Sequence, residues 1–116
     1  MDEMYLSMFS ENQKLSIMSV LLEIIYGDGK VDYREVSFFN TLSKELGLGD
    51  DAIDKIKRKS VLLSLLDIKS FTTEQKKQLA MLMDKTIKID EDININEVVI
   101  YEVVISFCHI DIPFQS

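Results

Sequence analysis

Apolar residues recur at spacings of three and four along most of this chain, the period of one face of an α-helix. The first such pattern follows Ser10 and Gln13, which together match a capping box. Its apolar stripe consists of Ile17, Val20, Leu21, Ile24 and Ile25. The string Tyr26-Gly27-Asp28-Gly29 ends it, so we predict a long helix between Ser10 and Tyr26. The stretch over 3–9 is expected to form a short amphipathic helix laid on the core.

A second pattern follows the Gly-rich turn. Asp32 and Glu35 match another capping box, and the stripe of the predicted helix is Val36, Phe39, Leu42 and Leu46. Gly47 lies just past its end and Leu48 follows, which predicts a left-handed C-cap with a hydrophobic contact.

Three further helices are predicted next, two short and one long. Asp50 or Asp51 is expected to cap a short helix around Ile53 and Ile56, and the apolar segment 61–68 predicts another. A long helix should then begin after Phe71, with Thr72 and Gln75 as its capping box. Its inward residues are predicted to be Leu79, Leu82, Met83 and Ile87.

The last apolar segment, 98–105, is rich in β-branched residues that favour a strand by propensity alone. Polar residues nevertheless recur near every fourth position, at Glu97, Glu102, Ser106 and His109. Asn94 with Glu97 also matches a capping box. We therefore predict a buried helix.

The two halves of the chain are related by a shift of 62 residues. The matched pairs are Gln13 with Gln75, Lys14 with Lys76, Ile25 with Ile87, Asp28 with Asp90, Asp32 with Asn94, and Glu35 with Glu97. The shared order of helix, acidic turn, capping box and helix indicates an internal repeat. We expect one all-α domain over 1–116, with one half at about 11–48, connecting helices at 50–69 and the second half at about 72–110.

Composition narrows the class of protein. The 116 residues are 47% hydrophobic, enough for a core without disulfides or a structural metal. A single cysteine predicts a reducing compartment, and the acidic N-terminus is unlike a secretory signal, so a cytoplasmic location is expected. The apolar stretches are short, which predicts no membrane insertion. We expect a monomer or a weak dimer.

The net charge of −7 opposes nucleic-acid binding, because phosphate backbones repel it. The one dense basic run, Lys55-Ile56-Lys57-Arg58-Lys59, suits the negative end of a helix dipole. We predict no nucleic-acid partner.

Two acidic clusters are candidate metal sites. The first holds Asp28, Asp32 and Glu35; the second holds Asp90, Glu91, Asp92, Asn94 and Glu97. Hard divalent cations such as calcium, magnesium or manganese take several oxygen ligands on a short loop. Neither cluster is an EF-hand: in the second, Ile95 and Tyr101 occupy positions that need Gly and Glu, and in the first, Lys30 occupies a ligand position.

The same residues are also explained without a metal. Asp32 with Glu35 and Asn94 with Glu97 serve as capping boxes. Asp28 and Asp90 end helices, where a carboxylate opposes the dipole by about 0.3–1 kcal/mol. A bound cation or an Asx-turn would each relieve that conflict, and both explanations stay open.

The string from Tyr26 to Glu35, followed by an apolar helix and Glu45-Leu46-Gly47-Leu48, resembles the TerB-like (tellurite resistance protein TerB) family over about 11–110. Its signature Asp-Gly-x-Val/Ile-x-x-x-Glu fits the first turn; the second has Glu91 in place of Gly. The resemblance implies about seven helices with pseudo-twofold symmetry and acidic residues of both turns gathered on one face, proposed in the family to bind a divalent cation. It also implies a stress-response role without enzymatic activity.

Catalytic chemistry is not indicated. Cys108 and His109 are adjacent and so about 100° apart on a helix, which does not suit a nucleophile and its base. No phosphate-binding glycine loop is present. Three hypotheses follow: a non-catalytic module whose acidic face binds a cation or a basic protein partner, a calcium- or magnesium-responsive regulator, and a metal-dependent hydrolase.

Overall fold

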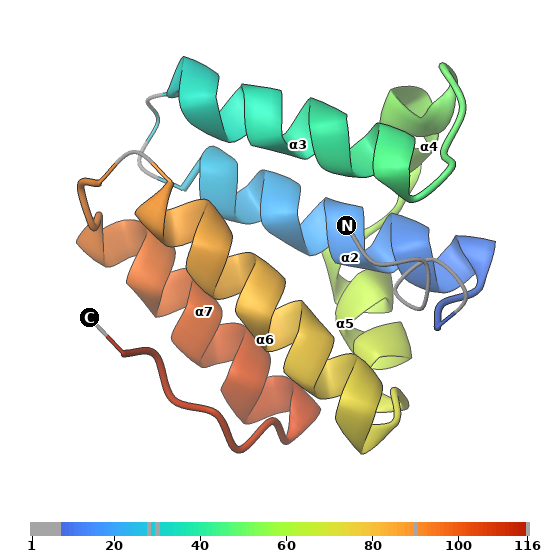
Figure 1. Cartoon of the computed structure of the whole chain (residues 1–116). Coiled ribbons are helices and arrows are strands. Elements are labelled where there is room, and N and C mark those ends of the chain that lie inside the picture. The colour runs from blue at the N-terminus through green and yellow to red at the C-terminus, as the bar shows by residue number, and fades with distance from the viewer. Residues whose placement is uncertain (1–7, 28, 30, 90, 116) are drawn as a thin grey trace.

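The structure is a computed structural model that describes residues 8–27, 29, 31–89 and 91–115. Within these residues the fold is all-α, as predicted, with six helices and no strand (Figure 1). The helices are α2 (Glu11–Ile25), α3 (Tyr33–Glu45), α4 (Ala52–Arg58), α5 (Val61–Lys69), α6 (Thr73–Lys88) and α7 (Ile95–Cys108). The helix expected over 3–9 falls mostly outside the described residues.

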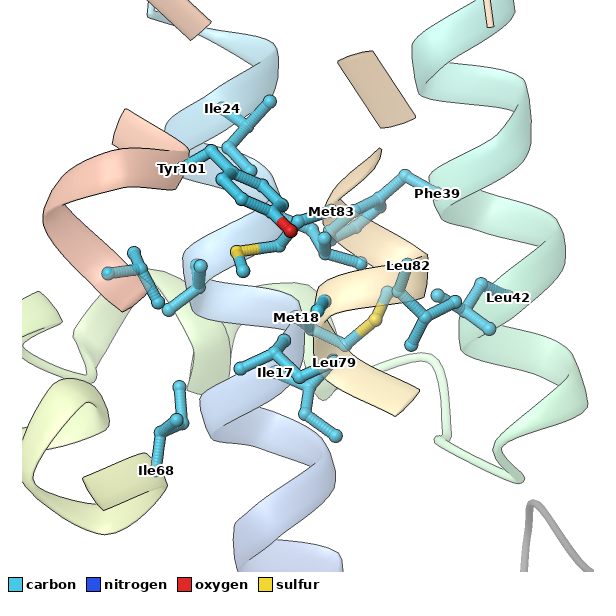
Figure 2. Packing of buried hydrophobic residues seen from close by; sticks show 14 of the residues in the cluster. Ile17, Met18, Ile24, Phe39, Leu42, Ile68, Leu79, Leu82, Met83 and Tyr101 are labelled. Carbon is cyan, nitrogen blue, oxygen red and sulfur yellow. The ribbon is translucent and has the colours of Figure 1, made fainter. Parts of the chain in front are cut away.

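The central helix is α2, which packs against each of the other five. All five residues of its predicted stripe are buried, as are the four inward residues predicted for α6. Figure 2 shows side chains of α2, α3 and α6 meeting around Met18. Burial of these apolar surfaces at roughly 25 cal/mol per Å² holds the bundle together.

Two of the predicted capping boxes are complete. At the start of α2 the amide N–H of Gln13 donates to Ser10 Oγ at 3.2 Å, and the amide N–H of Ser10 donates to Gln13 Oε1 at 2.8 Å. Thr72 and Gln75 repeat this exchange at the start of α6, at 3.2 and 2.9 Å. Both long helices of the repeat therefore begin where local chemistry predicts.

The caps of α3 and α7 differ from prediction. The Asp32 carboxylate accepts from the Arg34 amide at 2.7 Å, and the Asn94 side chain accepts from the Asn96 amide at 2.8 Å. Each cap thus bonds the second residue of its helix, while Glu35 and Glu97 are buried side chains.

Helix α4 departs further from its predicted cap. Asp51 stands at the N-cap of α4 without a side-chain cap bond, and its carboxylate lies 3.2 Å from Lys55 Nζ.

The repeat is visible in the backbone. Residues 11 and 73 begin α2 and α6, and residues 33 and 95 begin α3 and α7, so both pairs of helix starts are 62 residues apart. Positive φ angles recur at the same shift, at Gly29 (77°) with Glu91 (65°) and at Gly47 (74°) with His109 (57°). The predicted left-handed C-cap at Gly47 is confirmed, and the amide of Leu48 donates to the Ser43 carbonyl at 3.0 Å.

Helix α7 is confirmed as a helix, but the prediction that it is buried is wrong for its outer face. Ile95, Val99 and Val103 are 71%, 52% and 55% exposed. These residues point away from the core because α5, α2 and α6 cover only the other sides of α7. No helix among the described residues combines the length and apolarity that crossing a bilayer requires.

Candidate functional site

The two acidic turns lie at the same end of the bundle. In Figure 1 the ends of α2 and α6 and the starts of α3 and α7 all lie on one side. Gly27 at the end of α2 also approaches α7 closely, since a Cβ added there would lie 2.8 Å from Ile100 Cδ1. The absence of a side chain at Gly27 thus lets the first turn pack against α7, the helix that follows the second acidic turn.

Asp32 is held by its neighbour Arg34. The carboxylate accepts from Arg34 Nε at 3.2 Å and Nη2 at 3.3 Å, in addition to the amide of Arg34. These hydrogen bonds, the guanidinium first, lower the pKa of Asp32 below its ordinary value. The group therefore stays ionised at neutral pH, and it serves as a helix cap.

Glu35 and Glu97 are equivalent in the repeat and are both buried, at 2% and 1% exposure. A carboxyl group is rarely buried to this extent unless it has polar or charged company. Each lies in the first turn of its helix, where the positive end of the helix dipole favours negative charge. The fold thus places one interior glutamate beside each acidic turn.

The remaining candidate metal ligands differ in where they lie and in what they contact. Asp92 is exposed, Asn94 caps α7, and Asp28 and Asp90 lie outside the described residues. Within the part of the chain that the structure describes, no three carboxylate, histidine or cysteine side chains are grouped closely enough to hold a metal ion. The described ligands alone therefore form no metal centre.

Cys108 and His109 have separate structural roles. The thiol is buried and donates to the Leu65 carbonyl at 3.4 Å, and burial raises its pKa to about 11. His109 is exposed and ends α7 in the left-handed conformation. A thiol this weakly acidic supplies little thiolate at neutral pH, so the pair does not form a nucleophilic site.

A second surface was not singled out from the sequence. Exposed apolar side chains continue from α5 onto the neighbouring α7, and we call this surface the α5–α7 face. It consists of Leu62, Leu66, Ile95, Val99, Val103 and Phe107, with exposures between 36% and 71%. Lys69 Nζ lies 5.4 Å from the Phe107 ring centroid at one end of the face.

A cleft of about 200 Å³ runs between the two helices of this face. Val61 and Leu65 line it from α5, Val99 and Val103 line it from α7, and Glu23 of α2 reaches its rim. On the opposite side of the α7 ridge, Glu102 borders a shallow hollow that Val99 and Val103 also line. The apolar centre is therefore flanked by carboxylates on two sides.

A signal for this face exists in the sequence. Segments 61–68 and 98–105 carry apolar residues on nearly every side of a helix, more than one core-facing stripe requires. An all-apolar helix is consistent with complete burial, which is how segment 98–105 was interpreted above. Only the arrangement of neighbouring helices shows which side stays exposed.

The fold is similar to a known structure. The crystal structure of a protein of unknown function from Porphyromonas gingivalis W83 matches with a TM-score of 0.73, covering 91% of this chain and 89% of that one. The two sequences are 19% identical, a level at which the likeness establishes the fold alone. No family model and no curated protein matches the chain.

Proposed function

We propose that this chain is a non-catalytic, TerB-like protein-interaction module that docks a protein partner on the α5–α7 face. The observation that carries the proposal is the run of large apolar side chains exposed on two adjacent helices. Apolar patches larger than a few hundred Å² are rare on monomers and mark interaction sites. Covering such a patch is favourable by roughly 25 cal/mol per Å².

The resemblance to TerB supports a role for the module in a tellurite-resistance or general stress response in the cytoplasm. The support comes from the turn signature at Gly29, Val31 and Glu35. The proposal needs no catalytic residue: Cys108 is buried and His109 ends a helix.

Site-specific photo-crosslinking in the native cells tests this function. A photoreactive phenylalanine analogue at Leu66 is expected to give discrete protein adducts that disappear when Val103→Glu is added. Both positions are exposed, so neither change removes core packing. The same analogue at the exposed Lys77 of α6 is the control and should give no adduct that depends on Val103. Identical adduct patterns with and without Val103→Glu would contradict the proposal.

A second candidate function is a calcium- or magnesium-responsive regulator. The observation that favours it is the paired burial of Glu35 and Glu97 beside the two acidic turns. Calorimetric titration of EDTA-stripped protein with calcium, magnesium and manganese tests it. Saturable binding that is lost in Glu35→Gln and Glu97→Gln variants would support a cation site, provided that both variants retain the parent circular-dichroism spectrum. Absence of binding heat with all three metals would count against it.

A further inference from the structure

We propose that the partner of the α5–α7 face is a short amphipathic helix with basic flanks. The inference rests on the proposed function and adds the chemistry of the occupant. Its two supports are the shape of the face and the charges around it, both of which select against other occupants.

The shape of the face is that of a helix-binding groove. Val61 and Leu65 form a ridge of four-residue spacing on the α5 side of the cleft, and Val99 with Val103 forms the ridge on its α7 side. Helices pack by placing the side-chain ridge of one into the groove of another. The cleft between these two ridges therefore accepts apolar side chains spaced at three and four residues, the anchors by which an amphipathic helix is recognised.

The charges select a basic helix. Glu23 and Glu102 are exposed on either side of the Val99–Val103 ridge, and the whole chain carries −7. Lys69 lies next to Phe107 at one end of the face, away from the two glutamates that flank the Val99–Val103 ridge. A partner with Lys or Arg beside its apolar stripe brings opposite charge to both glutamates.

The same charges disfavour a second copy of this chain. Two copies would each bring −7 to the contact, and each would add its own Glu23 and Glu102 to the rim. Like charges placed across an interface cost binding energy, so self-association on this face is opposed. A cationic helix carries no such penalty.

Fluorescence anisotropy with designed peptides tests the proposal. The probe is a labelled peptide of about 14 residues, long enough for a helix, with Leu on one face and Lys on the others. One comparison peptide has the same composition in scrambled order, and another replaces every Lys with Glu. We expect the Leu–Lys peptide to bind at least about tenfold more tightly than either, with affinity falling as salt increases.

Matched protein variants locate the binding. Val99→Ser with Val103→Ser should weaken the Leu–Lys peptide at least about tenfold, the usual effect of losing central anchors. Glu23→Lys with Glu102→Lys should also weaken it, whereas Asp50→Lys with Asp54→Lys, which changes net charge equally beside and within α4, should weaken it less. Equal binding of the scrambled peptide, or equal effects of the two charge reversals, would overturn the proposal.

Sedimentation of the parent chain tests whether a second copy of the chain covers the face instead. A concentration-dependent dimer that Val103→Glu abolishes would show that a second copy covers the face and would overturn the basic-helix proposal. If the Leu–Lys peptide does not bind but the crosslinks still depend on Val103, the basic helix is rejected and the docking function is retained. Absence of those crosslinks would reject the docking function itself.

Discussion

The side-chain amide of Gln75 donates to the Gln13 amide oxygen at 3.3 Å, and the two residues occupy equivalent positions in the repeat. Phe9 and Phe71, also 62 residues apart, place their ring centroids 5.6 Å from each other. Contacts between equivalent residues are what an axis of twofold symmetry produces. The two halves therefore meet at the starts of α2 and α6, where the capping boxes lie side by side.

This contact predicts unequal effects of two similar substitutions. In Gln75→Glu the cap acceptor is retained, but an oxygen replaces the amide that donates to the Met8 carbonyl at 2.7 Å and to Gln13. Because Gln75 is buried, we expect a loss of about 2–3 kcal/mol in unfolding free energy. Gln13→Glu keeps the accepting oxygen and should cost less than about 1 kcal/mol. Urea denaturation measures both, and equal losses would contradict the assigned donor and acceptor.

Two non-glycine residues in the described part of the chain have positive φ, and each predicts a stabilising substitution. Glu91→Gly and His109→Gly should each raise the unfolding free energy by about 1 kcal/mol, because the left-handed conformation costs side-chain-bearing residues that amount. Gly29→Ala and Gly47→Ala are the converse controls. A Cβ at either site meets no atom within 4 Å, so a loss of about 1 kcal/mol would reflect the backbone alone. Thermal unfolding that shows no gain for either glycine variant would contradict this account.

Asp67 predicts a pH-dependent contribution to stability. Its carboxylate contacts Lys59 Nζ at 3.0 Å and accepts from Ser16 Oγ at 2.9 Å, and these contacts, Lys59 first, lower its pKa. A lowered folded-state pKa stabilises the protein above the unfolded value of about 3.9, and the effect is lost as pH falls through the folded value. Asp67→Asn should cost about 1 kcal/mol at neutral pH, and the difference from the parent should shrink below about pH 4.

Urea titrations at several pH values measure this difference. Asp54→Asn, at an exposed position of α4, is the matched control and should cost less at neutral pH. A deficit for Asp67→Asn that stays constant down to pH 2 would show that packing, not the ionised carboxylate, carries the effect.

Cys108 is expected to resist thiol reagents in the folded protein. Its side chain has no measurable exposure, and its pKa is raised to about 11. At pH 8 the reaction with an aromatic disulfide should be at least about 100-fold slower than in urea-unfolded chain, because both access and thiolate are lacking. A native rate close to the unfolded rate would show that the C-terminal end of α7 opens readily.

Local chemistry made much of the fold predictable. Ser10 with Gln13 and Thr72 with Gln75 set helix starts through bonds within three residues, so these starts follow from neighbours in the chain. Gly47 ends α3 for the same kind of reason, because only its own backbone freedom is needed. The 62-residue repeat likewise follows from residue order, and the helix starts coincide at that shift.

Burial was decided by the tertiary structure. Val99 and Val104 are the same β-branched residue type on α7, yet Val104 faces the core and Val99 faces outward. Periodicity cannot distinguish these two sides when both are apolar, because exposure depends on which helices pack nearby. Glu35 and Glu97 are predicted from the sequence as capping-box residues or metal ligands, and the fold buries both because helix packing encloses them. The sequence alone thus determined the helices and their repeat, whereas the α5–α7 face and the buried glutamates depend on contacts between segments far apart in the chain.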